Sequence, residues 1–166
     1  FIILSNICSC ISISFLLLSS RCKTKAAMLR FQIVDVSFAT LSNVFVLGYS
    51  GVISGSVSLI RNILVYKKVT VKHLPIILVS ATLIVGTINF IFTEHTWYAL
   101  FPIIASASYT AALCMKISYK MVKYALILNL MLWSIYGTCT KNYVSTIGYV
   151  MVMINAISTI NNIEEE

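Results

Sequence analysis

The sequence predicts an all-α integral membrane protein with seven transmembrane helices, arranged as two parallel three-helix repeats joined by a linker helix. Hydrophobic residues make up 59% of the chain and charged residues only 10%, more apolar surface than a water-soluble domain of 166 residues could hide. Apolar stretches of about 18 or more residues follow one another, each long enough to cross a hydrocarbon core of ~30 Å. A pattern of cations, glycine and asparagine also occurs twice, at a constant separation of 93 residues.

The first predicted span, residues 1–20, is apolar and is followed by Arg21. It has no charged leading region and no small-x-small cleavage site, so we expect a retained span rather than a signal peptide. The second span, 31–48, follows a basic loop and contains Asp35. A tight hairpin separates it from the third span, 50–66, because one continuous helix over both would overshoot the bilayer about twofold.

The fourth span, 74–92, is an apolar stretch with one histidine near each end. The fifth, 97–115, contains Pro102, which loosens a helix because it removes a backbone donor. The sixth and seventh spans, 121–139 and 143–160, are separated by only three polar residues. This short separation predicts a second tight hairpin.

The positions of Lys and Arg predict the orientation, because cations near span ends remain on the cytoplasmic side. If the N-terminus is outside, only Lys141 of the twelve cations falls on the outer side. The acidic tail, 162–166, is then cytoplasmic, which agrees with the rule because carboxylates contribute little to it. The predicted topology is N-out and C-in. The inner cations are Arg21, Lys23, Lys25, Arg30, Arg61, Lys67, Lys68, Lys72, Lys116, Lys120 and Lys123.

The duplicated pattern predicts the domain organisation. Two three-helix units can share one orientation only if an odd number of crossings joins them, and the span 74–92 supplies one crossing. We therefore predict a first unit at 1–66, a linker helix at 74–92, a second unit at 97–161 and the tail at 162–166. The repeated residues are Lys23, Arg30-Phe31, Gly55 and Asn62 in the first half, and Lys116, Lys123-Tyr124, Gly148 and Asn155 in the second.

Several function classes find no support in the sequence. The net charge of +7 comes from cations beside alternating spans rather than from a basic face, which argues against nucleic-acid binding. The five cysteines form no CxxC pair, and His73 and His95 lie at opposite ends of one span, so we expect no metal site. No nucleophile with a neighbouring base and no phosphate-binding loop is present. We expect neither enzyme activity nor a cofactor.

Asn62 and Asn155 are the repeated polar residues, each near the inner third of the third helix of its unit. An amide both donates and accepts hydrogen bonds, so two of them facing one another could bind a hydroxylated or zwitterionic solute. They could equally bond to neighbouring helices, and the sequence leaves the two interpretations open. Trp133 and Tyr136 are further candidates, which either line a cavity or anchor the outer interface.

Asp35 is the only carboxylate within a predicted span, about five residues from the cytoplasmic end by helical rise. Arg61 has a similar depth in the next span, so an ion pair between the two is geometrically compatible with the predicted topology. In the favoured interpretation, Arg61 extends toward the interface and Asp35 has a structural role. The other interpretation is that Asp35 is a proton-coupling site.

Four parts of the chain resemble one known family. The segment from Gly48 to Leu64, with Leu59-Ile60-Arg61-Asn62-Ile63-Leu64 and the following Lys67-Lys68, resembles the central segment of the YgjV-like bacterial inner-membrane proteins. Leu100-Phe101-Pro102-Ile103-Ile104, Leu132-Trp133-Ser134-Ile135-Tyr136 and Ile154-Asn155-Ala156-Ile157 resemble its C-terminal half, in matching order. The resemblance covers most of the chain and implies a location in the bacterial inner (plasma) membrane. It implies no particular activity.

A more distant resemblance is to the SWEET and PQ-loop (MtN3-like) transporters, which share the three-one-three arrangement and the outside N-terminus. In that group, asparagines on the third helix of each repeat face the sugar. By repeat position, the resemblance implies the same role for Asn62 and Asn155, with Trp133 as a pocket aromatic.

The leading hypothesis is a small polytopic inner-membrane protein that moves a small polar solute, either passively or with protons. The alternative is a structural or assembly protein whose spans only pack with lipid or partner subunits. The expected partners are the lipid bilayer, a small polar solute and, in a homo-oligomer, further copies of the chain.

Overall fold

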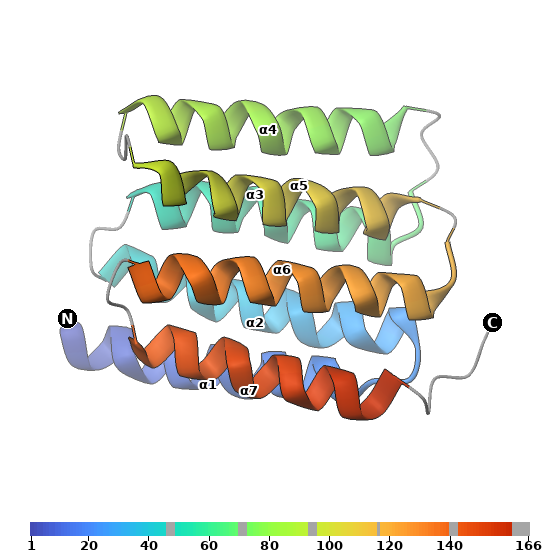
Figure 1. Cartoon of the computed structure of the whole chain (residues 1–166), viewed down its shortest axis with the longest axis horizontal. Helices are drawn as coiled ribbons and strands as arrows, with labels where there is room; N and C mark the ends of the chain where they lie inside the picture. The colour runs from blue at the N-terminus through green and yellow to red at the C-terminus, as the bar shows by residue number, and fades with distance from the viewer. Residues whose placement is uncertain (46–48, 70–72, 93–95, 116, 140–142, 161–166) are drawn as a thin grey trace. The chain divides into compact units, whose positions relative to one another are not determined.

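The computed structural model of the chain describes residues 1–45, 49–69, 73–92, 96–115, 117–139 and 143–160. These residues form seven α-helices and one short 3-10 helix, which confirms the predicted all-α fold (Figure 1). Their contacts divide the chain into two compact units, Phe1–Thr70 and Val71–Glu166.

The first unit contains α1 (Ile2–Arg21), α2 (Lys25–Phe45) and α3 (Tyr49–Tyr66). Successive helices are antiparallel, and α2 lies between its two neighbours and packs against both (Figure 1). Polar side chains on α2 can therefore meet either α1 or α3.

The contact between α1 and α2 follows a seven-residue repeat. The two rows of buried residues advance by seven positions, which is two helical turns on one face, and they run in opposite directions. Because the helices are antiparallel, the residues pair level by level along this contact. Ser5 faces Ser42 and Ser12 faces Asp35 through hydrogen bonds, and the same register places buried Ser19 level with buried Met28.

The contact between α2 and α3 is closest at Gly55. A Cβ atom added to this glycine would clash with the Thr40 hydroxyl group and lie 3.2 Å from the Thr40 Cβ atom. The Thr40 hydroxyl donates to the Val36 carbonyl at 2.7 Å, which holds the threonine side chain in place. Gly55 thus lets the two helices approach closely, as small residues do at helix contacts in membranes.

The second unit contains α4 (Leu74–Phe92), α5 (Leu100–Cys114), α6 (Tyr119–Cys139) and α7 (Tyr143–Thr159), with the 3-10 helix η1 (Trp97–Ala99) before α5. Each helix packs against the next one along the chain (Figure 1). A small residue again marks a close contact, since a Cβ atom added to Gly86 of α4 would lie 2.9 Å from the Ile103 side chain of α5.

The predicted spans match the helices within a few residues, except that α2 begins at Lys25 rather than at residue 31. The first turn of α2 is supported by Thr24, whose hydroxyl accepts from the Ala27 amide at 3.4 Å. The contacts group α4 with α5, α6 and α7. The division into two three-helix repeats and a linker stays a prediction.

Four helical segments of the described residues are long and apolar enough to cross a membrane, and Thr146–Thr159 is a shorter apolar helix. Polar residues lower the hydropathy of the other helices, as Asp35 does in α2. The seven crossings and their N-out orientation stay predictions, and the acidic tail 162–166 and Lys141 lie outside the described residues. The four segments are Ile3–Arg21, Leu74–Phe92, Trp97–Cys114 and Tyr119–Cys139.

Candidate functional site

A row of hydroxyl groups lies between α1 and α2. We define the serine row as Ser5, Ser9 and Ser12 of α1 together with Ser42 of α2. The Ser42 hydroxyl is 2.7 Å from the Ser5 hydroxyl and 2.8 Å from the Ser9 hydroxyl. It also lies 3.0 Å from the Ser5 carbonyl oxygen, to which it can donate. The row therefore places hydroxyl groups along the face of α1 that packs against α2.

Asp35 lies at one end of the serine row, near the middle of α2. Its Oδ1 atom accepts a hydrogen bond of 2.6 Å from the Ser12 hydroxyl, and the residue is only 7% exposed. It is the one carboxylate side chain among the described residues. The ion pair with Arg61 stays a prediction, because the hydrogen bonds described for Asp35 and Arg61 run to Ser12 and Asn62 respectively.

Arg61 and Asn62 form a buried polar pair on α3. Arg61 is 6% exposed and Asn62 is completely buried. The Arg61 Nε–H group donates to Asn62 Oδ1 at 3.0 Å, which fixes the orientation of the amide. Among the described residues, Asn62 Nδ2 has no hydrogen-bond partner. A buried donor without a partner costs about 1–3 kcal/mol, so a bound group that accepts from Nδ2 would be stabilised there.

Asn155 of α7 differs from Asn62 in that it is partly exposed. The backbone carbonyl oxygen of Asn155 accepts from the hydroxyl groups of Thr159 at 3.1 Å and Ser158 at 2.9 Å. The helices α3 and α7 begin 94 residues apart rather than 93, and the residue 94 after Asn62 is Ala156, which is completely buried. A solute site shared by Asn62 and Asn155 stays a prediction.

Trp133 and Tyr136 belong to a chain of six aromatic rings in the second unit. The Trp133 ring centroid lies 5.8 Å from that of Tyr136 and 6.1 Å from that of Tyr149. Trp and Tyr near helix ends are typical of the membrane interface, and this position agrees with an anchoring role, while a cavity at these residues stays a prediction. The chain continues from Tyr136 through Tyr98, Trp97 and Phe101, with centroid separations of 6.2, 5.8 and 5.6 Å.

Lys123 of α6 is a buried cation, whereas the sequence predicts for it an inner-side charge and a place in the duplicated pattern. It is completely buried, its Nζ atom donates to the Thr159 hydroxyl at 3.4 Å, and it lies 5.8 Å from the Tyr119 ring centroid. The register of α6 could have revealed it, since Lys123 shares its face with the buried apolar residues Leu126 and Leu130.

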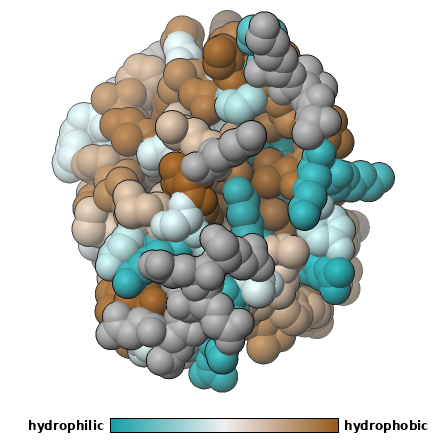
Figure 2. Space-filling model, turned by 90° about the vertical axis from the view of Figure 1, so that its right-hand side faces the viewer, coloured by the Kyte–Doolittle hydropathy of each residue, from teal (hydrophilic) through white to brown (hydrophobic). Residues whose placement is uncertain are grey.

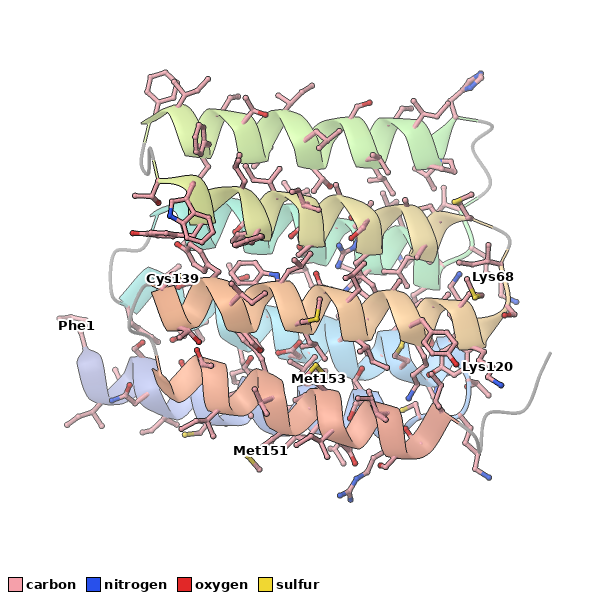
Figure 3. The ribbon with its side chains drawn as sticks, viewed as in Figure 1. Phe1, Lys68, Lys120, Cys139, Met151 and Met153 are labelled. Atoms are coloured by element: carbon pink, nitrogen blue, oxygen red, sulfur yellow. The ribbon has the colours of Figure 1, made fainter. Side chains whose placement is uncertain are left out.

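Cations gather at one end of the first unit. Because the helices of the first unit are antiparallel, Arg21, Lys25 and Lys68 all lie at the end where α1 and α3 finish and α2 starts. In the second unit, Lys120 lies where α6 starts, and Figure 3 labels both Lys68 and Lys120. Figure 2 shows one face of the molecule, on which hydrophilic residues lie among apolar ones.

The remaining chemistry of the described residues is limited. All five cysteines are free thiols, and Cys8 is the buried one. No group of three or more His, Cys, Asp or Glu side chains that could hold a metal ion occurs within the described ranges. The polar groups that remain as candidates are those of α1, α2 and α3, together with Lys123 and the aromatic chain.

The comparisons with known proteins agree with a membrane location. A family model described as bacterial inner membrane protein, Imp-YgjV, matches residues 3–166. No curated protein and no solved structure matches the chain.

Proposed function

The chain belongs to the Imp-YgjV family of bacterial inner membrane proteins, and we propose that in this membrane it moves a small polar solute, with Asn62 as the principal solute-binding side chain. The observation that carries the proposal is the buried Asn62 Nδ2 group, which has no partner among the described residues. In an apolar interior such a donor is stabilised when a solute or water supplies the missing acceptor.

The pairing with Arg61 supports a binding role rather than a packing role for Asn62. An amide that only packs donates hydrogen bonds to a neighbouring helix. The Asn62 side chain instead accepts a hydrogen bond from Arg61 through its oxygen, and its NH₂ group has no partner among the described residues. A donor fixed in this way recognises a hydroxyl or carbonyl oxygen, which sugars, polyols and amino acids all carry.

The distribution of charge supports the N-out, C-in orientation that the proposal includes. In the first unit, Arg21, Lys25 and Lys68 lie at the end where α1 and α3 finish and α2 starts. The positive-inside rule assigns this side to the cytoplasm. Asn62 then lies close to the cytoplasmic end of α3, four residues before Tyr66.

Uptake into proteoliposomes tests the proposal. With a panel of radiolabelled sugars, polyols and amino acids, we expect at least one solute to enter faster than into protein-free liposomes. Asn62→Ala should lower that uptake about tenfold, since one lost hydrogen bond is worth about 1.4 kcal/mol. Asn155→Ala, measured in parallel, tests whether the second repeat takes part.

Asn43→Ala is the matched control, because the Asn43 Nδ2 group donates to the Ala39 carbonyl of its own helix at 3.0 Å. It should leave uptake within about twofold of the unchanged protein. If no solute of the panel enters, or if Asn43→Ala and Asn62→Ala lower uptake equally, the binding role of Asn62 is wrong.

A structural or assembly role is the second candidate, and the surface of α4 favours it. In the candidate membrane span Leu74–Phe92 of α4, only 6% of the residues are buried, and Ile76, Ile84 and Ile88 are more than half exposed. Such an apolar face suits lipid or a partner subunit. This candidate gains if the panel shows no uptake at all.

A further inference from the structure

We propose that the contact between α1 and α2 is a proton path, that the serine row carries protons along it, and that Asp35 is the group that binds and releases them. The path itself follows from contacts within the first unit. Its use to drive a solute rests on the proposed function, and the experiment below separates the two.

The serine row leads directly to the carboxylate. Ser12 and Asp35 face each other at one level of the α1–α2 contact, and Ser5 and Ser42 face each other two turns away. Ser9 of α1 adds another hydroxyl group, which lies 2.8 Å from the Ser42 hydroxyl. Four hydroxyl groups therefore lie between the start of α1 and Asp35, the one carboxylate of the described residues.

Hydroxyl groups can relay a proton because each one both donates and accepts a hydrogen bond. A hydroxyl oxygen accepts a proton from one neighbour and releases its own proton to the next, so no group in the row changes its net charge. In the last step Ser12 gives its proton to Asp35 Oδ1 and takes another from the row. The carboxylate becomes a carboxylic acid, each hydroxyl of the row exchanges one O–H bond for another, and release follows the same steps in reverse.

One gap in the row has to be bridged. Ser9 and Ser12 are three residues apart on one helix, which corresponds to a rise of about 4.5 Å. A single water molecule can join two oxygens separated by about 5.5 Å, since each of its hydrogen bonds is about 2.8 Å long. The proposed path therefore includes one water molecule at this level, between Ser9 and Ser12.

The contact between α1 and α2 changes character on the other side of Asp35. There Phe15 of α1 lies with its ring centroid 6.2 Å from that of Phe31 of α2. Beyond these rings, the Ser19 hydroxyl is completely buried and has no partner among the described residues. Ser19 continues the seven-residue repeat of Ser5 and Ser12. A further hydroxyl group therefore lies on the far side of the aromatic rings.

Polar, charged and titratable side chains of α1, α2 and α3 lie near the Asp35 carboxylate. From α1 they are Ser12 and, one turn away, the buried thiol of Cys8. The charged residue that α3 buries is Arg61, whose Nε donates to Asn62. On α2 itself, Gln32 is buried one turn from Asp35.

Infrared spectroscopy of the isotope-labelled protein in proteoliposomes tests the path. Asp35 is the single aspartate of the chain, so ¹³C-aspartate shifts the carboxyl band of this residue alone. We expect a protonated Asp35 band that titrates with pH and that exchanges its proton for deuterium when the buffer is changed to D₂O. Ser12→Ala and Ser42→Ala should each slow this exchange at least about tenfold, because alanine fills the same contact but cannot relay a proton.

Two controls make the result decisive. Ser14 is exposed on α1 and its hydroxyl donates to the Cys10 carbonyl at 2.9 Å, so Ser14→Ala should exchange like the unchanged protein. Ser42→Thr keeps the hydroxyl group and should restore fast exchange, and melting curves exclude unfolded variants. The proposal is overturned if Asp35 shows no protonated band at any pH, or if the alanine variants exchange as fast as Ser14→Ala.

Solute uptake measured with and without a proton gradient then separates coupling from the path. Uptake that depends on the gradient and is lost in Asp35→Asn supports coupling. Uptake that needs Asn62 but ignores the gradient overturns coupling while leaving the solute site intact. Slow exchange in the alanine variants without uptake of any solute supports the proton path and contradicts the transport proposal.

Discussion

Arg61→Ala is expected to destabilise the protein and to abolish solute uptake together. The substitution removes the donor that holds Asn62 Oδ1, so the amide loses its fixed orientation and its oxygen is left buried without this partner. A buried acceptor of this kind costs about 1–3 kcal/mol. Thermal unfolding in detergent should show a lower midpoint, and uptake into proteoliposomes should fall at least as far as in Asn62→Ala.

Arg30→Ala is the matched control for Arg61→Ala. Arg30 lies at the same end of the first unit, where its exposed Nε group donates to the Tyr66 hydroxyl at 2.7 Å. An exposed contact of this kind contributes about 0–1 kcal/mol, so the unfolding midpoint should barely move. In the double variant with Asn62→Ala, the cost of Arg61→Ala should shrink, because the orphaned oxygen is gone. Strict additivity of the two substitutions would contradict the coupling.

Gly55→Leu is expected to separate α3 from α2. Even a Cβ atom at this position clashes with the Thr40 hydroxyl, and the longer side chain has no space between the helices. Overpacking of this kind costs about 1–3 kcal/mol. The thermal unfolding midpoint should fall clearly below that of Gly86→Ala, which adds only one methyl group, 2.9 Å from the Ile103 side chain.

A compensating substitution shows whether the Thr40 contact is the cause. Thr40→Ala removes the hydroxyl that a Cβ atom at Gly55 would meet. The double variant Gly55→Ala, Thr40→Ala should therefore recover most of the stability that Gly55→Ala loses. If Gly55→Ala is as stable as the unchanged protein, or if Thr40→Ala recovers nothing, the close α2–α3 contact is not what Gly55 provides.

Helix positions were readable from the sequence because membrane-length apolar stretches carry a strong signal. The predicted start of the second span lies six residues after the observed start of α2, because the run of cations that ends at Arg30 is typical of a loop between spans. A cation close to a membrane interface can remain helical when its side chain extends to water. Four of the helical segments qualify as spans by length and composition alone. Orientation depends on a membrane that is not part of the fold.

The sequence predicts only part of the polar site. Asp35 and Asn62 stood out because each is a polar residue in an apolar span, and both are buried. The partner of Asp35, Ser12, was missed because serine is common in membrane helices and its role depends on the register between α1 and α2. Lys123 was missed for a similar reason, since burial of a cation depends on which helix face meets its neighbours.

Binding of a solute at Asn62 is tested most directly by thermal unfolding of the purified protein with and without the solute that it takes up. A ligand that binds only the folded state raises the unfolding midpoint. We predict that a saturating solute raises the midpoint of the unchanged protein and of Asn43→Ala, and leaves that of Asn62→Ala unmoved. A rise in Asn62→Ala equal to that of the unchanged protein would contradict the assignment of Asn62 as the solute-binding side chain.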